Sequence, residues 1–554
     1  MPFFSDPLKL SPPSLPLAWV VLLCLLWTML GLVGHDPWKP DEAYGFGLVY
    51  SLLQGGDWIV PMLAGEAFME NPPFYYLTAA ALAKVLGTWL PLHDGARLAS
   101  GFYMCITLVF TGLTGRELWG KGYGRITALL MIACLGLVAR THQLIADTAL
   151  LAGLSLAIYG LTLSPRRIVP AGMLIGVGTG LGFMAKGLLA PAIVASSLIL
   201  LPVITITLRS RAFLASTLLA LLLAAPWLVI WPTLLYQHDP LLFWEWLAQN
   251  RLASLFGMPI KAQISDHWFF LKNIVWFAWP ALPLAAWTLW AQRKSMRTEW
   301  RRIEIALPLG LFLITLVLLS LFSEGRDVET LPLLPPLAIL AAPAIASLRR
   351  GAANALDWFG IMTFGVIAFL LWLGWLSTLT GYPPALANWF EHKLPDYVMP
   401  VSGISLFVAL TISAAWAYLT VKMQRGALRG VVNAAMGITL VWGLLATLWL
   451  PWLNEGKSYR HMIADMQSTL PADYNCMASR NLGEPQRAML HYFASIQTLR
   501  EELTPNDCQF LITQNLDPLV IEDTYKDRRI LWQGSRPGDR SELFILLGKT
   551  NTID

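Results

Sequence analysis

A series of long apolar segments is the feature that most constrains how this chain of 554 residues can fold. A helix that crosses a bilayer needs about 20 mostly apolar residues, and we count about thirteen segments of that kind. The pattern therefore predicts an all-α polytopic membrane bundle of about thirteen transmembrane helices. The predicted segments are 16–34, 97–114, 125–141, 147–163, 168–185, 187–206, 212–231, 268–291, 303–322, 331–347, 357–378, 400–421 and 430–451.

The composition agrees with a surface that mostly faces lipid. Only 13% of the residues are charged, whereas a soluble protein contains roughly 25%. The 25 Trp and 15 Tyr suit the aromatic belts at the two membrane interfaces. The net charge of +4 comes with no basic patch that carries interleaved aromatic residues, so no nucleic-acid partner is expected.

The distribution of basic residues predicts an orientation, because cytoplasmic loops collect Lys and Arg. Placing the basic clusters inside puts the remaining loops, and everything after 452, outside. The clusters are Arg116/Lys121/Arg125, Arg166/Arg167, Arg209/Arg211, Arg293 to Arg302, Arg349/Arg350 and Lys422/Arg425/Arg429. The outer loops are then 35–73, 142–147, 186, 232–267, 323–330 and 379–399.

One further apolar run, 74–90, is ambiguous. If it crossed the membrane, every later basic cluster would move outside, so we expect it to lie in the interface. The first outer loop then extends over 35–96 and contains juxtamembrane helices. The membrane domain spans 1–452, with a second large outer loop at 232–267.

The rest of the chain, 453–554, is polar and predicts a small α/β domain outside the membrane. Its short apolar stretches include Phe510–Thr513 and Leu543–Leu547. Cys476 and Cys508 lie in this domain, and they form a disulfide if the compartment is oxidising. The spacing leaves the pairing open.

Four acidic residues near the predicted outer ends of helices are candidates for chemistry: Asp41, Glu42, Glu70 and Asp147. Carboxylates are costly to bury next to a membrane and are often functional there. Several that face one cavity can serve as a general base or bind a cation. The alternative is that they are solvated interfacial charges or helix caps, and Asp147 in particular opens an apolar run.

Three cations also fall on the predicted outer side, against the positive-inside trend: Lys186, Arg251 and Arg326. Lys and Arg are natural partners of phosphate, so a lipid phosphate is one explanation. The alternative is that their side chains reach the lipid headgroups without a specific ligand.

Other mechanisms have no visible support. The sequence contains no Walker A sequence, no dinucleotide-binding fingerprint, no HExxH and no CxxC, and its eight His are scattered. No cofactor is therefore assigned; a divalent metal ion is kept as an open alternative that no motif supports.

The first outer loop resembles that of membrane glycosyltransferases of the GT-C type. The family includes the protein O-mannosyltransferases and the transferases that add 4-amino-4-deoxy-L-arabinose (aminoarabinose) to bacterial lipid A. The matching residues are Pro40-Asp41-Glu42, Gly56-Asp57-Trp58 with Pro61, Glu70-Asn71-Pro72-Pro73, Arg97, the region of Asp147, Met184-Ala185-Lys186-Gly187, Arg251 and 326–335.

The resemblance implies that a sugar carried on a polyprenyl (undecaprenyl) phosphate is transferred to an envelope acceptor such as lipid A. It implies a bacterial inner membrane, with the site and the C-terminal domain facing the periplasm. Asp41 would be the central carboxylate, Glu70 and Asp147 would line the same cavity, and Lys186 and Arg251 would hold the donor phosphate. The expected substrate-binding residues are Glu42, Tyr44, Asn71, Lys186, Arg251, Arg326 and Glu329.

The chain departs from the family pattern at three of these positions. Asn71 stands where the aminoarabinose transferases usually have Lys, Tyr44 where they have Arg, and Glu329 where a Tyr is common. The Glu-His pair that usually precedes the residue matching Arg251 is absent. These differences leave the sugar and the acceptor open. An acid at 329 suits an amino sugar or another cationic group, and the alternative is that it is a displaced surface residue.

Two other functions compete with the transferase interpretation. A transporter or flippase for a lipid-linked sugar would often show inverted repeats and broken helices at mid-membrane, which the sequence does not suggest. An assembly partner whose tail domain binds envelope components would leave the loop motifs without a purpose.

Overall fold

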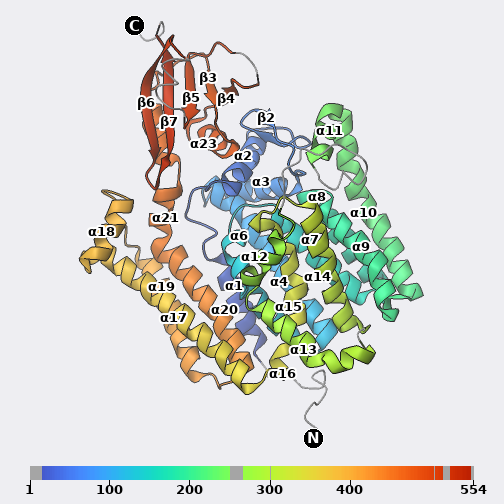
Figure 1. The fold of residues 1–554 in the computed structure, drawn as a ribbon. Coiled ribbons are helices and arrows are strands. Elements are labelled where there is room, and N and C mark those ends of the chain that lie inside the picture. The colour runs from blue at the N-terminus through green and yellow to red at the C-terminus, as the bar shows by residue number, and fades with distance from the viewer. Residues whose placement is uncertain (1–14, 250–265, 300, 504–505, 516–524, 551–554) are drawn as a thin grey trace.

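The computed structural model describes residues 15–249, 266–299, 301–503, 506–515 and 525–550. Figure 1 shows a large bundle of helices with a small sheet domain at one end, and the described part of the chain begins near the opposite end of the bundle. We call these the sheet end and the basic end of the bundle, for the charges described below. The predicted membrane bundle with a C-terminal α/β domain is confirmed.

The helices follow the apolar segments in chain order. They are α1 (Leu17–Met29), α2 (Asp41–Leu53), α3 (Phe74–Leu86), α4 (Leu92–Trp119), α5 (Tyr123–Ile132), α6 (Leu135–Thr141), α7 (Asp147–Leu163), α8 (Ile168–Lys186), α9 (Leu189–Ile204), α10 (Arg211–His238), α11 (Pro240–Gln249), α12 (Phe269–Phe277), α13 (Ala281–Glu299), α14 (Ile303–Phe322), the 3₁₀ helix η4 (Asp327–Leu333), α15 (Leu334–Ala341), α16 (Ala344–Ser347), α17 (Arg350–Thr380), α18 (Pro384–Lys393), α19 (Gly403–Lys422), α20 (Ala427–Leu444), the π-helical turn η5 (Leu445–Trp449), α21 (Leu450–Lys457), α22 (Arg460–Ser468) and α23 (Glu484–Ala494).

The described residues contain eight helical segments that are long and apolar enough to cross a membrane, or nine if one bent pair counts as a span. Five further apolar helices, α1, α3, α5, α7 and α9, are shorter. The chain is therefore a multi-span membrane protein, but the predicted count of about thirteen spans is not confirmed.

The expectation of one continuous span over 268–291 is wrong. The structure has two helices there, α12 and α13, which meet at an angle of 96°. Pro280 lies at the break. Proline has no N–H for the helix ladder and its ring clashes with the preceding turn, which accounts for the interruption.

Glycines bring α7 and α8 into close contact. A Cβ atom added to Gly153 of α7 would lie 2.5 Å from the carbonyl oxygen of Gly178 on α8. Close backbone approach at small residues is the usual means by which membrane helices associate, since lipid provides no hydrophobic drive. The contact matters for the site, because Asp147 begins α7 and Lys186 ends α8.

A buried ion pair fixes α2 against α4. Arg97 of α4 is fully buried, and its Nε donates to Glu42 at 2.5 Å. Its other nitrogens donate to Asp94 at 2.7 Å and to the carbonyls of Leu32 and His35 at 2.9 Å each. The beginning of α4 is thereby held beside the beginning of α2.

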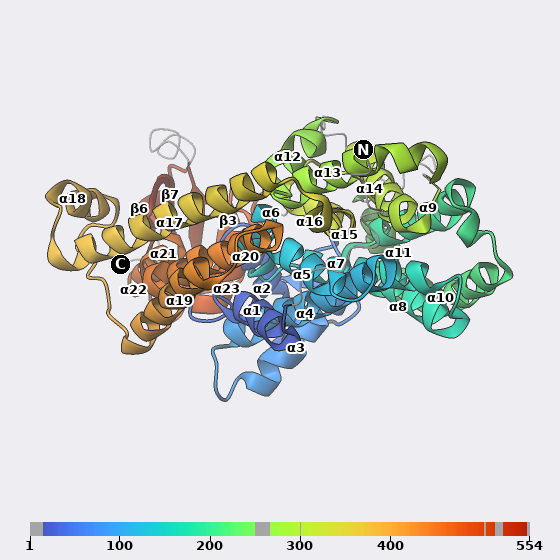
Figure 2. The same cartoon turned by 90° about the horizontal axis from the view of Figure 1, so that it is seen from below.

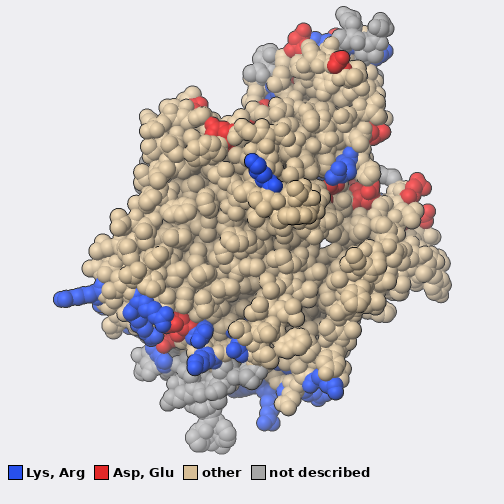
Figure 3. All heavy atoms as spheres, turned by 180° about the vertical axis from the view of Figure 1, so that it is seen from behind, with Lys and Arg blue, Asp and Glu red and all other residues tan. Residues whose placement is uncertain are grey.

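Seen from below (Figure 2), α17, α19 and α20 lie on one side of the molecule and α8, α9 and α10 on the other, with α4 and α7 between them. Figure 3 shows that Lys and Arg gather mostly at the end of the bundle opposite the C-terminal domain, whereas Asp and Glu lie mostly toward the sheet end. The two ends of the bundle therefore differ in charge.

The C-terminal domain is built on a five-stranded sheet in the order β4-β3-β5-β7-β6. Strand β3 runs parallel to β4 and β5, whereas β5 pairs with β7, and β7 with β6, in antiparallel fashion. Cys476 and Cys508 form a disulfide within this domain. The strands are β3 (Met477–Arg480), β4 (Thr498–Arg500), β5 (Phe510–Gln514), β6 (Arg528–Arg536) and β7 (Asp539–Lys549), and a two-stranded ribbon, β1 (Met62–Leu63) with β2 (Glu66–Ala67), lies in the first loop.

Ion pairs and one helix contact join the sheet domain to the first loop. Asp36 pairs with Arg460, and Lys39 pairs with Glu542. Helix α23 packs against α2. The first loop thus lies between the helix bundle and the sheet domain.

We predict that Arg97→Met strongly destabilises the protein, because it leaves Glu42 and Asp94 as buried charges without their partner. Breaking a buried pair in this way costs about 3–5 kcal/mol. Thermal unfolding in detergent should show a clear drop in Tm. The control is Arg166→Met at the basic end, where the arginine is 72% exposed and pairs with Glu117. An Arg97 variant as stable as this control would contradict the anchoring role.

Candidate active site

Polar residues from five segments meet at the sheet end of the bundle. Asp41 is the first residue of α2, where a carboxylate is favoured by the helix dipole. Glu70 lies in the loop that leads to α3. Asp147 begins α7 and Lys186 ends α8, where Gly187 with a φ of 63° terminates the helix.

Arg326 joins the first loop to the segment before η4. Its Nη2 donates to Asp41, and its Nη1 donates to Glu70 at 3.2 Å. One guanidinium therefore bridges two carboxylates that lie far apart in the sequence of the first loop. Burial disfavours the charge of Arg326, but Tyr44, Asp41 and Glu70 outweigh it, so the pKa of the guanidinium is raised.

Glu329 stabilises the backbone conformation at Arg326. Its Oε2 accepts a hydrogen bond of 2.9 Å from the backbone N–H of Arg326. The acid at position 329 thus has a local structural partner in addition to any contact with a substrate. Its predicted role in binding a sugar stays a prediction.

Arg140 of α6 is a site residue that the sequence analysis missed. Its Nη1 lies 3.8 Å from Asp41, and its Nη2 lies 3.5 Å from Asp327. The signal that could have identified it is its position: Arg140 is a fourth cation at the outer side, at the end of the predicted span 125–141. Asp41 consequently lies between two arginines.

Lys186 and Asp147 form the second half of the cluster. Their Nζ and Oδ2 atoms are 3.3 Å apart, and the side chains are only 14% and 6% exposed. Lys186 is also close enough to interact electrostatically with Glu70 and Arg326. The two ion-paired groups are therefore one site. The residue that precedes α7 is Ala146, so Asp147 is not the helix N-cap.

Two tyrosines and an amide surround these charges. Burial, together with the negative charges of Glu70 and Asp41, raises the pKa of Tyr44, so its hydroxyl stays protonated. The same side chain lies close enough to Arg326 to contribute to the raised pKa of the guanidinium. Asn71 donates to the hydroxyl of Tyr76 at 3.4 Å, and both side chains are buried. Tyr76 is another residue that the sequence analysis did not select.

Glu42 does not join this cluster. Its side chain is 1% exposed and is bound by Arg97, by the backbone N–H of Trp38 at 3.2 Å and by that of Leu144 at 3.4 Å. The two adjacent acids of the first loop therefore have different partners, and Glu42 acts on the site by positioning Asp41. The role that we predicted for Arg251 is untested, because this residue lies outside the described residues.

The charged side chains of the cluster nearly balance one another. Asp41, Glu70 and Asp147 face Arg140, Arg326 and Lys186. A phosphate that enters can take up hydrogen bonds from these cations and free carboxylate oxygens for a second substrate. The described residues include no group of three or more His, Cys, Asp or Glu arranged to hold a metal ion.

Comparison with known proteins shows what the chain resembles. No family model matches it. It is 27% identical over 445 residues to an undecaprenyl phosphate-alpha-4-amino-4-deoxy-L-arabinose arabinosyl transferase of Pseudomonas aeruginosa (strain UCBPP-PA14), which covers 78% of this chain and 75% of the relative. An enzyme of the same description from Pseudomonas savastanoi pv. phaseolicola is 28% identical over 364 residues.

The fold agrees with this relationship. The crystal structure of ArnT from Cupriavidus metallidurans bound to undecaprenyl phosphate superposes with a TM-score of 0.68, covering 96% of this chain and 98% of that one at 16% identity. The chain is a membrane glycosyltransferase of the GT-C type. The predicted family, fold and enzyme class are therefore confirmed, and the transporter and assembly-partner interpretations are set aside. The individual site residues remain proposals.

We predict that Arg326→Ala lowers the rate of glycosyl transfer by about 10²–10³-fold, because a cation aimed at developing charge is lost. It also leaves Asp41 and Glu70 without their shared partner. Arg326→Lys should recover part of the activity. Initial rates in purified membranes provide the measurement, with Lys272→Ala as the control, since Lys272 is exposed and pairs with Asp266 at the surface. Equal rates for the Arg326 and Lys272 variants would refute this assignment.

Proposed function

We propose that this glycosyltransferase moves an aminoarabinose-type sugar from undecaprenyl phosphate to lipid A at the outer face of a bacterial inner membrane. The observation that carries the proposal is the cluster in which Arg326 bridges Asp41 and Glu70 beside the Lys186–Asp147 pair. The names of the relatives support the choice of donor and sugar. Another envelope glycan or a protein remains the competing acceptor.

The cations are the proposed binding site for the donor phosphate. Arg326 pairs with Glu70, Lys186 is close enough to interact with the charge of Glu70, and Arg140 of α6 lies near Asp41. Arg251 is proposed as a further contact on the resemblance alone. Ionised donors form short, strong hydrogen bonds with phosphate oxygens, and arginine adds a planar, two-pronged geometry.

The proposed transfer is a single displacement. An acceptor oxygen attacks the anomeric carbon of the sugar, the bond from that carbon to the phosphate oxygen breaks, and undecaprenyl phosphate leaves with the bonding electron pair. Where the acceptor is a hydroxyl group, its proton passes to Asp41. Arg326 and Lys186 stabilise the negative charge that grows on the departing phosphate.

Asp41 can accept a proton from the acceptor only when its hydrogen bond from Arg326 is broken. Arg326 donates a hydrogen bond to Asp41 directly. A donor phosphate offers Arg326 an alternative acceptor, and the carboxylate oxygen of Asp41 can then take the hydrogen bond of the acceptor. In this proposal donor binding precedes activation of the acceptor.

The acidic residues around the cations suit an amino sugar. Asp327 and Glu329 add two carboxylates to the three of the central cluster. A protonated amino group on the sugar pairs favourably with such a surface, since opposite charges stabilise one another most where water is limited. A neutral hexose would gain less from these acids.

The basic end of the bundle is the proposed cytoplasmic side, and the sheet end the periplasmic side. The gathering of Lys and Arg at the basic end supports this orientation (Figure 3). The disulfide in the sheet domain also supports it, because disulfides persist in oxidising compartments such as the periplasm. Helix α3 is proposed to lie in the outer interface. Glu70, before α3, pairs with Arg326 at the site, and Arg97, after α3, pairs with Glu42 at the beginning of α2, so both ends of α3 lie on the same side of the bundle.

We predict that Asp41→Asn lowers transfer by about 10²–10⁴-fold, the range for a lost general base. Expression and Tm should stay close to those of the unmodified protein. The assay follows transfer from an undecaprenyl-phosphate sugar to lipid A by mass spectrometry. Asp266→Asn, which changes a surface carboxylate outside the site, is the control and should keep full activity. Full transfer by the Asp41 variant would exclude a central role.

We predict that Lys186→Ala raises the KM for the donor by about 10–100-fold, the equivalent of one lost hydrogen bond to a charged group. The Tm should change less than in the Arg97 variant. Lys186→Arg, which keeps the charge, should restore most donor binding. An unchanged donor KM in the alanine variant would place the phosphate elsewhere.

We predict that Cys476 and Cys508 react with a membrane-impermeant maleimide on intact spheroplasts only after treatment with a reductant. Two labels should be added, and a Cys476→Ser/Cys508→Ser variant should receive none under the same conditions. Labelling that requires lysis of the spheroplasts would reverse the proposed orientation.

A further inference from the structure

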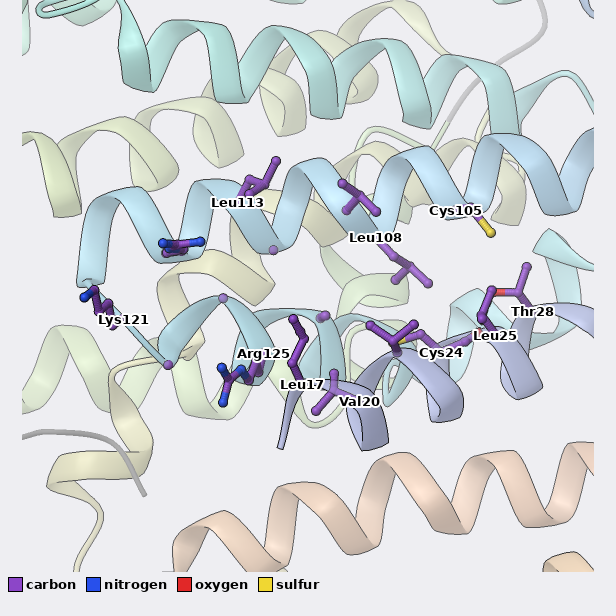
Figure 4. Close-up of a pocket in the computed structure, with 17 residues that line it drawn as sticks. Leu17, Val20, Cys24, Leu25, Thr28, Cys105, Leu108, Leu113, Lys121 and Arg125 are labelled. Carbon is purple, nitrogen blue, oxygen red and sulfur yellow. Dashed lines mark hydrogen bonds between the residues drawn. The ribbon is translucent and has the colours of Figure 1, made fainter. Parts of the chain in front are cut away.

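A second cavity lies at the basic end of the bundle, far along the helices from the candidate active site. It has a volume of about 450 Å³ and is bounded by α1, α4 and the beginning of α5 (Figure 4). Its walls are apolar. The side chains that matter here are Leu17, Val21 and Leu25 of α1 and Leu108, Val109 and Leu113 of α4.

Several of these side chains are open to the surroundings and not packed against protein. Leu17 is 58% exposed, Val109 is 56% exposed, and Val21 is 47% exposed. The cavity is therefore a groove in the lateral surface of the bundle, which faces lipid in a membrane. An apolar chain can enter it from the side.

Three cations line the same groove at one end: Arg116, Lys121 and Arg125. Figure 4 shows Lys121 and Arg125 at one end of the groove, and Thr28 and Cys105 at the other. Arg125 also donates to the carbonyl of Leu15. Among the residues that the structure describes, none of the three cations has a carboxylate partner within 4.0 Å; the nearby acid in sequence, Glu117, pairs with Arg166 at 3.4 Å instead.

The length of the groove matches one leaflet of a bilayer. It follows α1 from Leu17 to Thr28, which is about 16 Å at the helical rise of about 1.5 Å per residue. The apolar core of a bilayer is about 30 Å thick. A groove that begins at a cationic mouth and ends near the middle of the membrane has the dimensions of a single acyl chain with its headgroup.

We propose that this groove binds an anionic glycerophospholipid of the membrane. The lipid phosphate lies between Arg116, Lys121 and Arg125, and one acyl chain lies between α1 and α4. Basic pockets between membrane helices recognise anionic headgroups in this way. The site is separate from the proposed donor site, which is built at the other end of the bundle, and does not depend on the proposed function.

The three groove cations differ from ordinary basic residues at a membrane surface because their side chains meet at one apolar groove. Arg166, Arg211 and Arg350 are also exposed cations, in other loops at this end of the bundle, but none of them lines this groove. The three groove cations come from the end of α4, the turn after it and α5, and they meet at one apolar groove. A lipid held there would brace α1 against α4, whose other end carries the Arg97 anchor.

The test is native mass spectrometry of the full-length protein released from nanodiscs that contain phosphatidylglycerol, phosphatidylcholine or undecaprenyl phosphate in phosphatidylcholine. One tightly retained phosphatidylglycerol is expected, and no retained phosphatidylcholine. The variant Arg116→Gln/Lys121→Gln should retain it at least about tenfold less. The matched control Arg211→Gln/Arg350→Gln, which removes the same charge from the same end, should retain it fully.

A second variant tests the apolar half of the groove without changing charge. Val109→Trp fills the groove, and Phe102→Trp places the same side chain on an exposed position of α4 outside it. Only the Val109 variant should lose the lipid. Equal retention in the charge variant and its control, preferential retention of undecaprenyl phosphate, or an unchanged lipid in the Val109 variant would each overturn the proposal.

Discussion

The buried pair between Glu42 and Arg97 is the interaction on which the candidate active site depends. Two charges taken out of water are costly unless each finds good partners, and here Arg97 is also bound by Asp94 and by two backbone carbonyls. The pair holds the beginning of α2 against α4, and Asp41 is the residue next to Glu42. Adjacent residues on a helix point about 100° apart. One carboxylate can therefore be anchored in the protein while its neighbour faces the site.

The acidic and basic side chains of the candidate active site neutralise one another. Arg326 bridges Asp41 and Glu70, and Lys186 pairs with Asp147, so charges from five segments of the chain stabilise one another. A ligand with a phosphate at one end competes for these cations and changes the partners of the carboxylates. The ordering of substrates that we propose follows from this exchange. The phospholipid that we infer at the basic end would act on the other end of α4 and leave these charges unchanged.

The sequence was sufficient to predict which loops meet. The positive-inside trend placed the loops that carry Asp41, Glu70, Asp147, Lys186 and Arg326 on one side, and all five residues lie in one cluster. The partners within that cluster were not predictable. Choosing between Asp41 and Glu42 requires the rotation of α2, and the contribution of Arg140 requires the short helix α6 to end beside Asp41. The number of spans was also not predictable, because the length of an apolar segment does not reveal a bend such as the one at Pro280.

Mass spectrometry of lipid A from cells with and without the gene tests the central claim most directly. The account predicts that lipid A carries an added amino sugar only when the gene is present, and that the Asp41→Asn variant fails to restore it. Identical lipid A in the presence and absence of the gene, under conditions in which the protein is produced and folded, would contradict the account.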